Sequence, residues 1–152
     1  QSNHHAVSIY SKKGFSVRRE YSVLTASGPR PDWSNPIPVA AYGDFQAFPT
    51  EFSVSPSFEH TSDNISRNPQ LYEVLYLPGL AYCIYAKRNG EIIQLHYNVP
   101  DALKEVLSAL IGRFPSAMAK NIDCGSGDVL QVLLEIGFQE ILKQYEMVRN
   151  IP

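Results

Sequence analysis

Two segments far apart in this 152-residue chain share the same ending. Residues 3–15 read NHHAVSIYSKKGF and lead into SVRREYSVL at 16–24, while 127–138 read GDVLQVLLEIGF and lead into QEILKQYEMVR at 139–149. The pattern of each predicts a short helix that ends at Gly-Phe and is followed by a strand. A unit repeated in this way predicts two related halves. Because a lone helix and strand bury too little surface to form a domain, we expect the first copy to belong to a preceding half.

The two copies differ in the residues that precede the Gly-Phe pair. The first copy matches the pattern Asn-x-x-Ala-x-x-x-Tyr-x-x-x-Gly-Phe, at Asn3, Ala6, Tyr10, Gly14 and Phe15. This pattern resembles the last helix and strand of the GNAT acetyltransferase fold. The second copy keeps the Gly-Phe pair, but Leu133 stands in place of the tyrosine and Ser126 in place of the asparagine. The resemblance implies an α/β fold with a mixed, mostly antiparallel sheet flanked by helices.

The repeat and the resemblance together predict three segments. Residues 1–26 are expected to be the last helix and strand of a preceding GNAT domain, 27–35 a Pro- and Gly-containing linker, and 36–152 a complete GNAT-like domain. We therefore expect a chain cut from a longer protein, with the missing N-terminal GNAT domain as its main partner. Since the first helix and strand would lack the sheet they evolved to pack on, we also expect fraying, a homodimer or a domain swap through residues 1–26.

Hydrophobic patterning predicts the remaining elements. Asn89-Gly90 between two alternating runs is a strong hairpin signal, and a single apolar stripe predicts an amphipathic helix from Asp101 to Phe114. A stretch rich in Ser, Asn and His at 55–69 predicts a loop with one helical turn. The predicted elements are a helix at 3–13, strands at 15–25, 37–42, 71–77, 81–87 and 91–97, a helix at 101–114, a strand at 117–122, a helix at 127–136 and a strand at 140–149.

Composition argues against several classes of function. The formal net charge is -2 and no basic run exceeds two residues, so we expect no nucleic-acid binding. No apolar run approaches the roughly 18 residues of a membrane helix. Cys83 and Cys124 have no metal spacing, and the adjacent His4 and His5 point to different faces of a helix, so we expect no metal site. Cysteine usage of this kind favours a reducing cytoplasm.

GNAT proteins hold acetyl-CoA where the fourth and fifth strands splay apart, with its pyrophosphate on backbone N–H groups at the start of the next helix. Here that segment, 97–102, reads YNVPDA and contains no glycine. Pro100 lacks an N–H group, and Asp101 places negative charge where phosphates would dock, although an acid also suits the first turn of any helix. Under either interpretation the usual cradle is missing. Acetyl-CoA binding by residues 36–152 alone would need a phosphate cradle formed instead by the backbone amides of Asn98 and Val99.

Five residues are candidates for the site. By resemblance, Tyr10 is the general acid of the longer protein, although a tyrosine here also suits simple helix packing. His96, on the predicted fourth strand, is a candidate general base, or a strand histidine satisfied by hydrogen bonds. Asn3, Leu95 and Tyr97 are the positions that the resemblance assigns to acetyl-CoA.

The sequence thus predicts the C-terminal portion of a GNAT acetyltransferase, which moves an acetyl group from acetyl-CoA to an amine. The complete domain is expected to be degenerate and supporting, and the isolated chain to be inactive without a tightly bound cofactor. The alternative is a non-catalytic GNAT-fold module for interaction or dimerisation. Acetyl-CoA binding by the longer protein separates the two.

Overall fold

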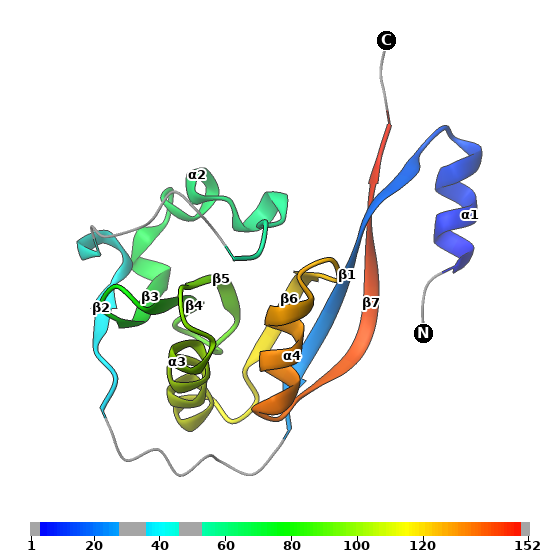
Figure 1. The fold of residues 1–152 in the computed structure, drawn as a ribbon. Coiled ribbons are helices and arrows are strands. Elements are labelled where there is room, and N and C mark those ends of the chain that lie inside the picture. The colour runs from blue at the N-terminus through cyan, green and yellow to red at the C-terminus, as the bar shows by residue number, and fades with distance from the viewer. Residues whose placement is uncertain (1–3, 28–35, 46–52, 150–152) are drawn as a thin grey trace.

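A computed structural model describes residues 4–27, 36–45 and 53–149, and within them seven strands form one sheet (Figure 1). The order across the sheet is β2-β3-β4-β5-β6-β1-β7. Three short 3-10 turns connect elements at 42–44, 58–60 and 69–71. The helices and strands are α1 (His4–Lys12), β1 (Ser16–Ala26), β2 (Val39–Ala41), α2 (Ser62–Ile65), β3 (Tyr72–Leu77), β4 (Ala81–Ala86), β5 (Ile92–Tyr97), α3 (Pro100–Arg113), β6 (Met118–Asp123), α4 (Gly127–Glu135) and β7 (Phe138–Val148).

These elements confirm the predicted mixed sheet. Every neighbouring pair is antiparallel except β5 and β6, which run parallel. From β3 onward each helix and strand begins and ends within two residues of its predicted bounds, because the hairpin and stripe signals there are local. The predicted linker falls largely on residues 28–35, which lie outside the described part of the chain.

The strand of the first repeat copy lies inside this sheet. β1 pairs with β6 on one side and with β7 on the other, and its second half is buried, with Leu24 fully enclosed. The expectation that this strand would lack partners within the chain is therefore wrong. The segment that resembles the end of a preceding domain is thus an inner strand of the described sheet. The division of the chain at residues 26 and 36 stays a prediction.

The two faces of the sheet carry separate cores. Strand residues point alternately to opposite faces. On one face α3 and α4 pack over the strands, and the amphipathic stripe of α3, from Leu103 to Ile111, is almost fully enclosed. On the other face Ile65 of α2 joins Val74, Ile84 and neighbouring residues of the central strands. α1 stands apart from these layers, beyond β7, and buries none of its residues (Figure 1).

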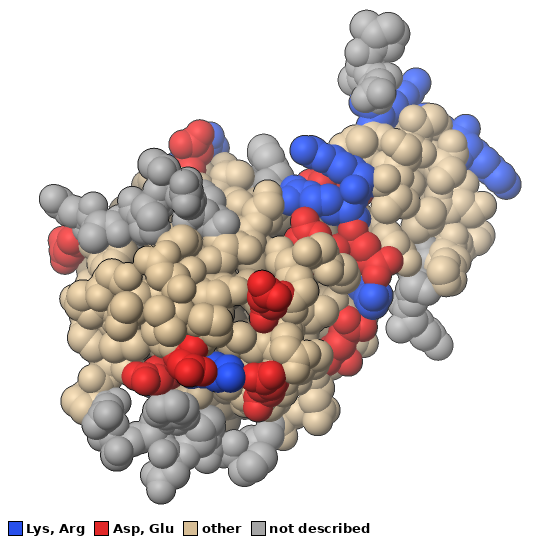
Figure 2. All heavy atoms as spheres, viewed as in Figure 1, with Lys and Arg blue, Asp and Glu red and all other residues tan. Residues whose placement is uncertain are grey.

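Side chains of both charges lie close together on the face drawn in Figure 2. Figure 2 shows lysine and arginine side chains beside aspartate and glutamate where the α1 end of the molecule meets the rest, and no purely basic face in this view. Within the described residues, no helix combines the length and the apolar character that crossing a membrane requires.

Candidate functional site

The parallel strands β5 and β6 meet only at their beginnings. Their one register pair is Ile92 with Ala119. Beyond it no further pair forms, so the carboxyl ends of the two strands, near Tyr97 and Asn121, stay unpaired, and this unpaired stretch is the gap between them. This is the junction at which the GNAT resemblance places the thioester of acetyl-CoA.

A loop of the same chain, residues 53–60, closes this gap from the β5 side. The backbone N–H of Tyr97 donates to the Ser53 hydroxyl at 3.1 Å, and that oxygen lies 3.4 Å from Nδ1 of His96. Val54, the next loop residue, is buried in the main core. The backbone donor that faces the gap on β5 is therefore already engaged.

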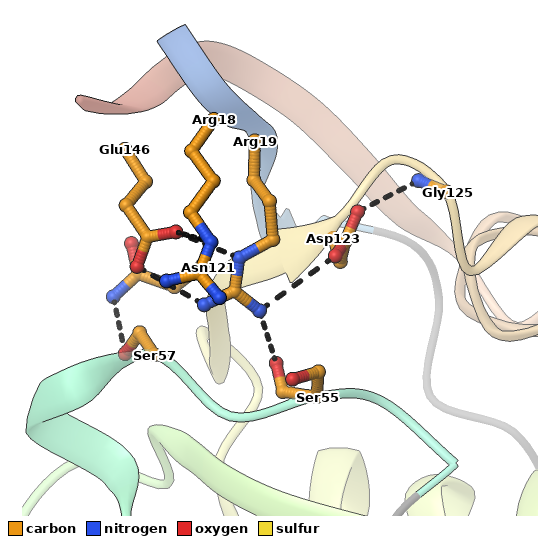
Figure 3. Close-up of polar contacts among 8 residues, drawn as sticks. All are labelled: Arg18, Arg19, Ser55, Ser57, Asn121, Asp123, Gly125 and Glu146. Carbon is orange, nitrogen blue, oxygen red and sulfur yellow. Dashed lines mark hydrogen bonds and ion pairs between the residues drawn. The ribbon is translucent and has the colours of Figure 1, made fainter. Parts of the chain in front are cut away.

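The loop is also held from the β6 and β1 sides. The Asn121 side-chain amide donates to the Ser57 hydroxyl at 3.2 Å, and the Arg19 guanidinium donates to the Ser55 carbonyl at 3.5 Å (Figure 3). Asn121 has a φ of 56°, a left-handed conformation that asparagine tolerates better than most residues. This local departure from strand geometry accompanies the contact with the loop.

The far end of the loop is fixed by a buried histidine. The Gln94 side-chain amide donates to the carbonyl of His60. Burial lowers the pKa of His60 and so favours the neutral ring, which lies 4.0 Å from the Glu91 carboxylate. Glu91 is itself paired with Lys120 of β6 at 3.2 Å. The loop thus contacts β5 at Ser53 and His60 and β6 at Ser57.

The start of α3 offers few free donors to an anion. The helix begins at Pro100, which has no N–H, and the Asp101 side chain is 86% exposed, 3.5 Å from Lys104. Asp101 is therefore a first-turn acid and not the N-cap, which is Val99. The amide of Asn98 donates to the Leu80 carbonyl at 2.8 Å, so a phosphate cradle built from it would have to break that bond.

The structure separates the two predicted catalytic residues. Tyr10 is 48% exposed and lines a cavity of about 770 Å³ together with Phe15, whose ring lies edge-on to it at 5.7 Å. His96 lines a different cavity, of about 470 Å³, where its ring lies 5.8 Å from that of Tyr82. Tyr10 and His96 therefore do not share a site within this chain.

Two of the residues predicted to bind acetyl-CoA lie in different surroundings. Leu95 is 2% exposed and belongs to the core, while Tyr97 is half-buried beside the loop. Asn3 lies outside the described residues. Leu133, at the position equivalent to Tyr10, is fully buried. Within the described ranges, no group of three or more His, Cys, Asp or Glu side chains could hold a metal ion.

Sequence reasoning did not identify the residues that close the gap. Ser53 and Ser57 belong to a Ser-rich stretch whose pattern predicts only a loop, and Asn121 is one polar residue of a strand. Hydrogen bonds between side chains distant in sequence have no periodic signature, so the pattern offered no means of finding them.

Arg19 connects the loop with the edge of the sheet. It donates to both carboxylate oxygens of Glu146 at 2.8 and 3.0 Å and lies 3.8 Å from Asp123, as Figure 3 shows. Its guanidinium also lies 5.2 Å from the centre of the Tyr21 ring. The hydrogen bonds from Arg19 hold the pKa of Glu146 below its usual range.

Replacing Arg19 is expected to destabilise the fold, and the adjacent arginine provides a matched control. Arg19→Ala removes a bidentate, largely buried ion pair and should lower the free energy of unfolding by about 2 kcal/mol. Arg18 lies 3.8 Å from the same carboxylate, but its side chain is 62% exposed, so Arg18→Ala should cost less than about 0.5 kcal/mol. Urea denaturation of both variants measures the difference. Equal losses would contradict this assignment.

Comparison with known proteins supports the fold. No family model and no curated protein sequence matches the chain. A "putative acetyltransferase" from Pyrococcus horikoshii superposes with a TM-score of 0.69 at 12% identity, over 96% of this chain and 50% of that one. A "putative acetyltransferase from the GNAT family" of Novosphingobium aromaticivorans has a TM-score of 0.43 at 11% identity, over 88% of this chain and 65% of that one.

This chain therefore spans about half the length of the Pyrococcus protein that it resembles. The similarity extends over nearly the whole chain, α1 and β1 included, and the sheet order with its one parallel junction agrees with it. The protein has the GNAT-like acyl-CoA N-acyltransferase fold.

Proposed function

We propose that this chain is the C-terminal portion of a two-domain GNAT acetyltransferase, which transfers an acetyl group from acetyl-CoA to an amine. In this proposal residues 36–152 support catalysis in the other half and bind no acetyl-CoA of their own. The observation that carries the proposal is the loop at 53–60, which bridges β5 and β6 where the family binds its thioester.

The residues of the second half do not fit acetyl-CoA. The Tyr97 amide is bonded to Ser53, Pro100 has no N–H to offer, and the exposed Asp101 carboxylate repels phosphate. Admitting the thioester would require the loop to leave together with Val54, which is part of the core. A supporting role follows more readily from this arrangement than an independent one.

The first copy of the repeat supports placing the chemistry in the other half. It carries the five-residue match, including Tyr10, whose hydroxyl has no equivalent at Leu133. An amine that attacks the thioester carbon releases the CoA thiolate, and a tyrosine hydroxyl at this position would give the thiolate its proton. Tyr10 would serve the preceding domain, of which α1 is the last helix.

A second candidate function is a non-catalytic module that keeps the fold for interaction or dimerisation. Such a module would bind its partner through the exposed apolar residues of α1, Ile9 and Tyr10 among them. It predicts that the longer polypeptide containing this chain also fails to bind acetyl-CoA, whereas the acetyltransferase proposal predicts binding.

Titration calorimetry tests the proposal. The 152-residue chain is expected to show no heat of binding with acetyl-CoA up to about 1 mM, which corresponds to a binding free energy weaker than about -4 kcal/mol. The longer polypeptide is the positive control and is expected to bind. A micromolar dissociation constant for the isolated chain, about -8 kcal/mol, would show that the gap opens and that this half is not degenerate.

A further inference from the structure

The pairing of β1 with β7 has an internal symmetry. A shift of 123 residues carries Phe15 onto Phe138, and it also maps nine of the ten residue pairs of this ladder onto pairs of the same ladder; the end pair Ala26↔Phe138 has no counterpart. The two strands are therefore related in space by a local two-fold. The pairs exchanged by the shift are Ser16↔Val148 with Thr25↔Gln139, Val17↔Met147 with Leu24↔Glu140, Arg19↔Glu146 with Val23↔Leu142, and Glu20↔Tyr145 with Ser22↔Lys143, while Tyr21↔Gln144 maps onto itself.

The irregularities of the ladder obey the same symmetry. The register slips once near each end, leaving Arg18 unpaired on β1 and Ile141 unpaired on β7. The shift that superposes the Gly-Phe pairs also carries Arg18 onto Ile141. Bulges are specific structural features, so their matched positions show that the symmetry extends to the backbone.

The symmetry is broken at the outer edges of the two strands. The far edge of β1 is covered by β6, whereas β7 is the last strand of the described sheet. The Cys124 amide donates to the Glu20 carbonyl, and the Ala26 amide donates to the Ala117 carbonyl, so alternate residues from Glu20 to Ala26 face β6.

The two-fold places the equivalents of these β1 residues on the open edge of β7. Lys143, Tyr145 and Met147 correspond to Glu20, Ser22 and Leu24, so their backbone N–H and C=O groups face away from β1. Gln144, between them, faces β1. An edge with a row of such groups is a template for another strand.

The two helices are also buried to different extents. Ile9 and Tyr10 on α1 are 42% and 48% exposed. Their equivalents on α4, Val132 and Leu133, are 4% and 0% exposed because α4 packs on the core of its own domain. In Figure 1, α1 lies beyond β7, on the side where the symmetry requires a second core.

We propose that the preceding domain of the same polypeptide occupies the docking surface formed by the outer edge of β7 at residues 143–147, the exposed Ile9 and Tyr10 of α1, and Phe15 just after that helix. That domain would add a strand equivalent to β6, antiparallel to β7, and a core equivalent to the one under α4. The two domains would then share one continuous sheet. This inference rests on the proposed two-domain function and specifies how the halves join.

Two observations favour this occupant over a second copy of the chain. The Pyrococcus structure that this chain resembles is about twice as long, so a chain with this fold can also carry a second domain of similar length. A second copy has no β6 to offer, because its β6 is already paired with β5 on one side and β1 on the other. The symmetry is completed only by a domain whose equivalent of β6 still has one unpaired edge.

Residue-resolved hydrogen exchange tests the proposal. In the monomeric 152-residue chain, the amides of Lys143, Tyr145 and Met147 should exchange at least about tenfold faster than that of Gln144, and in the longer polypeptide they should become as protected as Gln144. Equal protection in the monomer, or protection through dimers of this chain, would overturn the proposal. Fast exchange of these three amides in the longer polypeptide would overturn it as well.

Proline substitution supplies matched variants. Met147→Pro removes an amide that faces outward, so the isolated chain should keep its stability, while protection of Ile9 and Tyr145 in the longer polypeptide should be lost. Gln144→Pro removes an amide that faces β1 and should destabilise both proteins. If Met147→Pro leaves protection in the longer polypeptide unchanged, no strand is docked on this edge.

These experiments distinguish failure of the docking surface from failure of the proposed acetyltransferase function. Protection gained at Tyr145 without acetyl-CoA binding would refute the acetyltransferase and leave the docking surface standing. Acetyl transfer by a longer polypeptide in which these amides stay exposed would support the acetyltransferase and refute the docking surface.

Discussion

Gly90→Ala is expected to lower the free energy of unfolding by about 2–5 kcal/mol, a large part of the stability of a domain of this size. Gly90 turns the chain between β4 and β5 with a φ of +69°. A left-handed conformation costs an alanine about 1–2 kcal/mol. In addition, its Cβ would lie 2.5 Å from Cβ and Cγ of Phe114, a contact that forces the end of α3 to move and adds about 1–3 kcal/mol.

Gly79→Ala is the matched control for Gly90. Gly79 turns the chain between β3 and β4 with a φ of +70°, but a Cβ there meets nothing within 4 Å. It should therefore show the conformational cost alone. Thermal or urea denaturation, followed by circular dichroism, gives both values. Equal losses at the two positions would show that Phe114 moves aside without cost.

Tyr10→Phe is expected to lower the turnover of the longer polypeptide by roughly 10²–10⁴-fold while leaving its fold and its affinity for acetyl-CoA nearly unchanged. The substitution removes one hydroxyl and keeps the ring that packs the helix. Without the hydroxyl, the departing thiolate has no positioned proton donor. Turnover should be measured with saturating acetyl-CoA, under conditions in which the chemical step limits the rate.

The control for Tyr10 has to remove a hydroxyl from the same surroundings. Tyr145 lines the same cavity as Tyr10, so Tyr145→Phe is a suitable control and should leave turnover within a few fold of the wild type. A larger residue at Leu133 is unsuitable, because Leu133 is fully enclosed and Leu133→Phe would overpack the core. If Tyr10→Phe and Tyr145→Phe are equally active, Tyr10 serves only packing.

The sequence predicted those parts of the fold that depend on neighbours along the chain. The hairpin at Asn89-Gly90 and the apolar stripe of α3 are such features, and both are confirmed. The insertion of β1 between β6 and β7 depends on pairing across more than a hundred residues, for which a single sequence carries no periodic signal. The Gly-Phe repeat nevertheless pointed to the two strands that turn out to be symmetric partners.

The candidate site was predicted less completely than the fold. The poor phosphate cradle could be read from Pro100 and Asp101, because missing donors and added charge are properties of residue type. The closed gap could not, because it depends on hydroxyls and amides meeting in space, such as Ser57 with Asn121. His96 was singled out by residue type, yet the structure places it against Ser53 and Tyr82 and not near Tyr10.

The position of β1 also constrains when this protein can fold. Residues 16–26 are synthesised before both strands that flank them, 118–123 and 138–148. The nascent chain therefore carries a strand with two open edges while residues 27–117 are being synthesised. Contacts between the two ends of a chain form late and slowly, because a long loop must close before they bring any gain. The sheet can be completed only after β7 has been made, so at least one edge of β1 stays open to other chains until then.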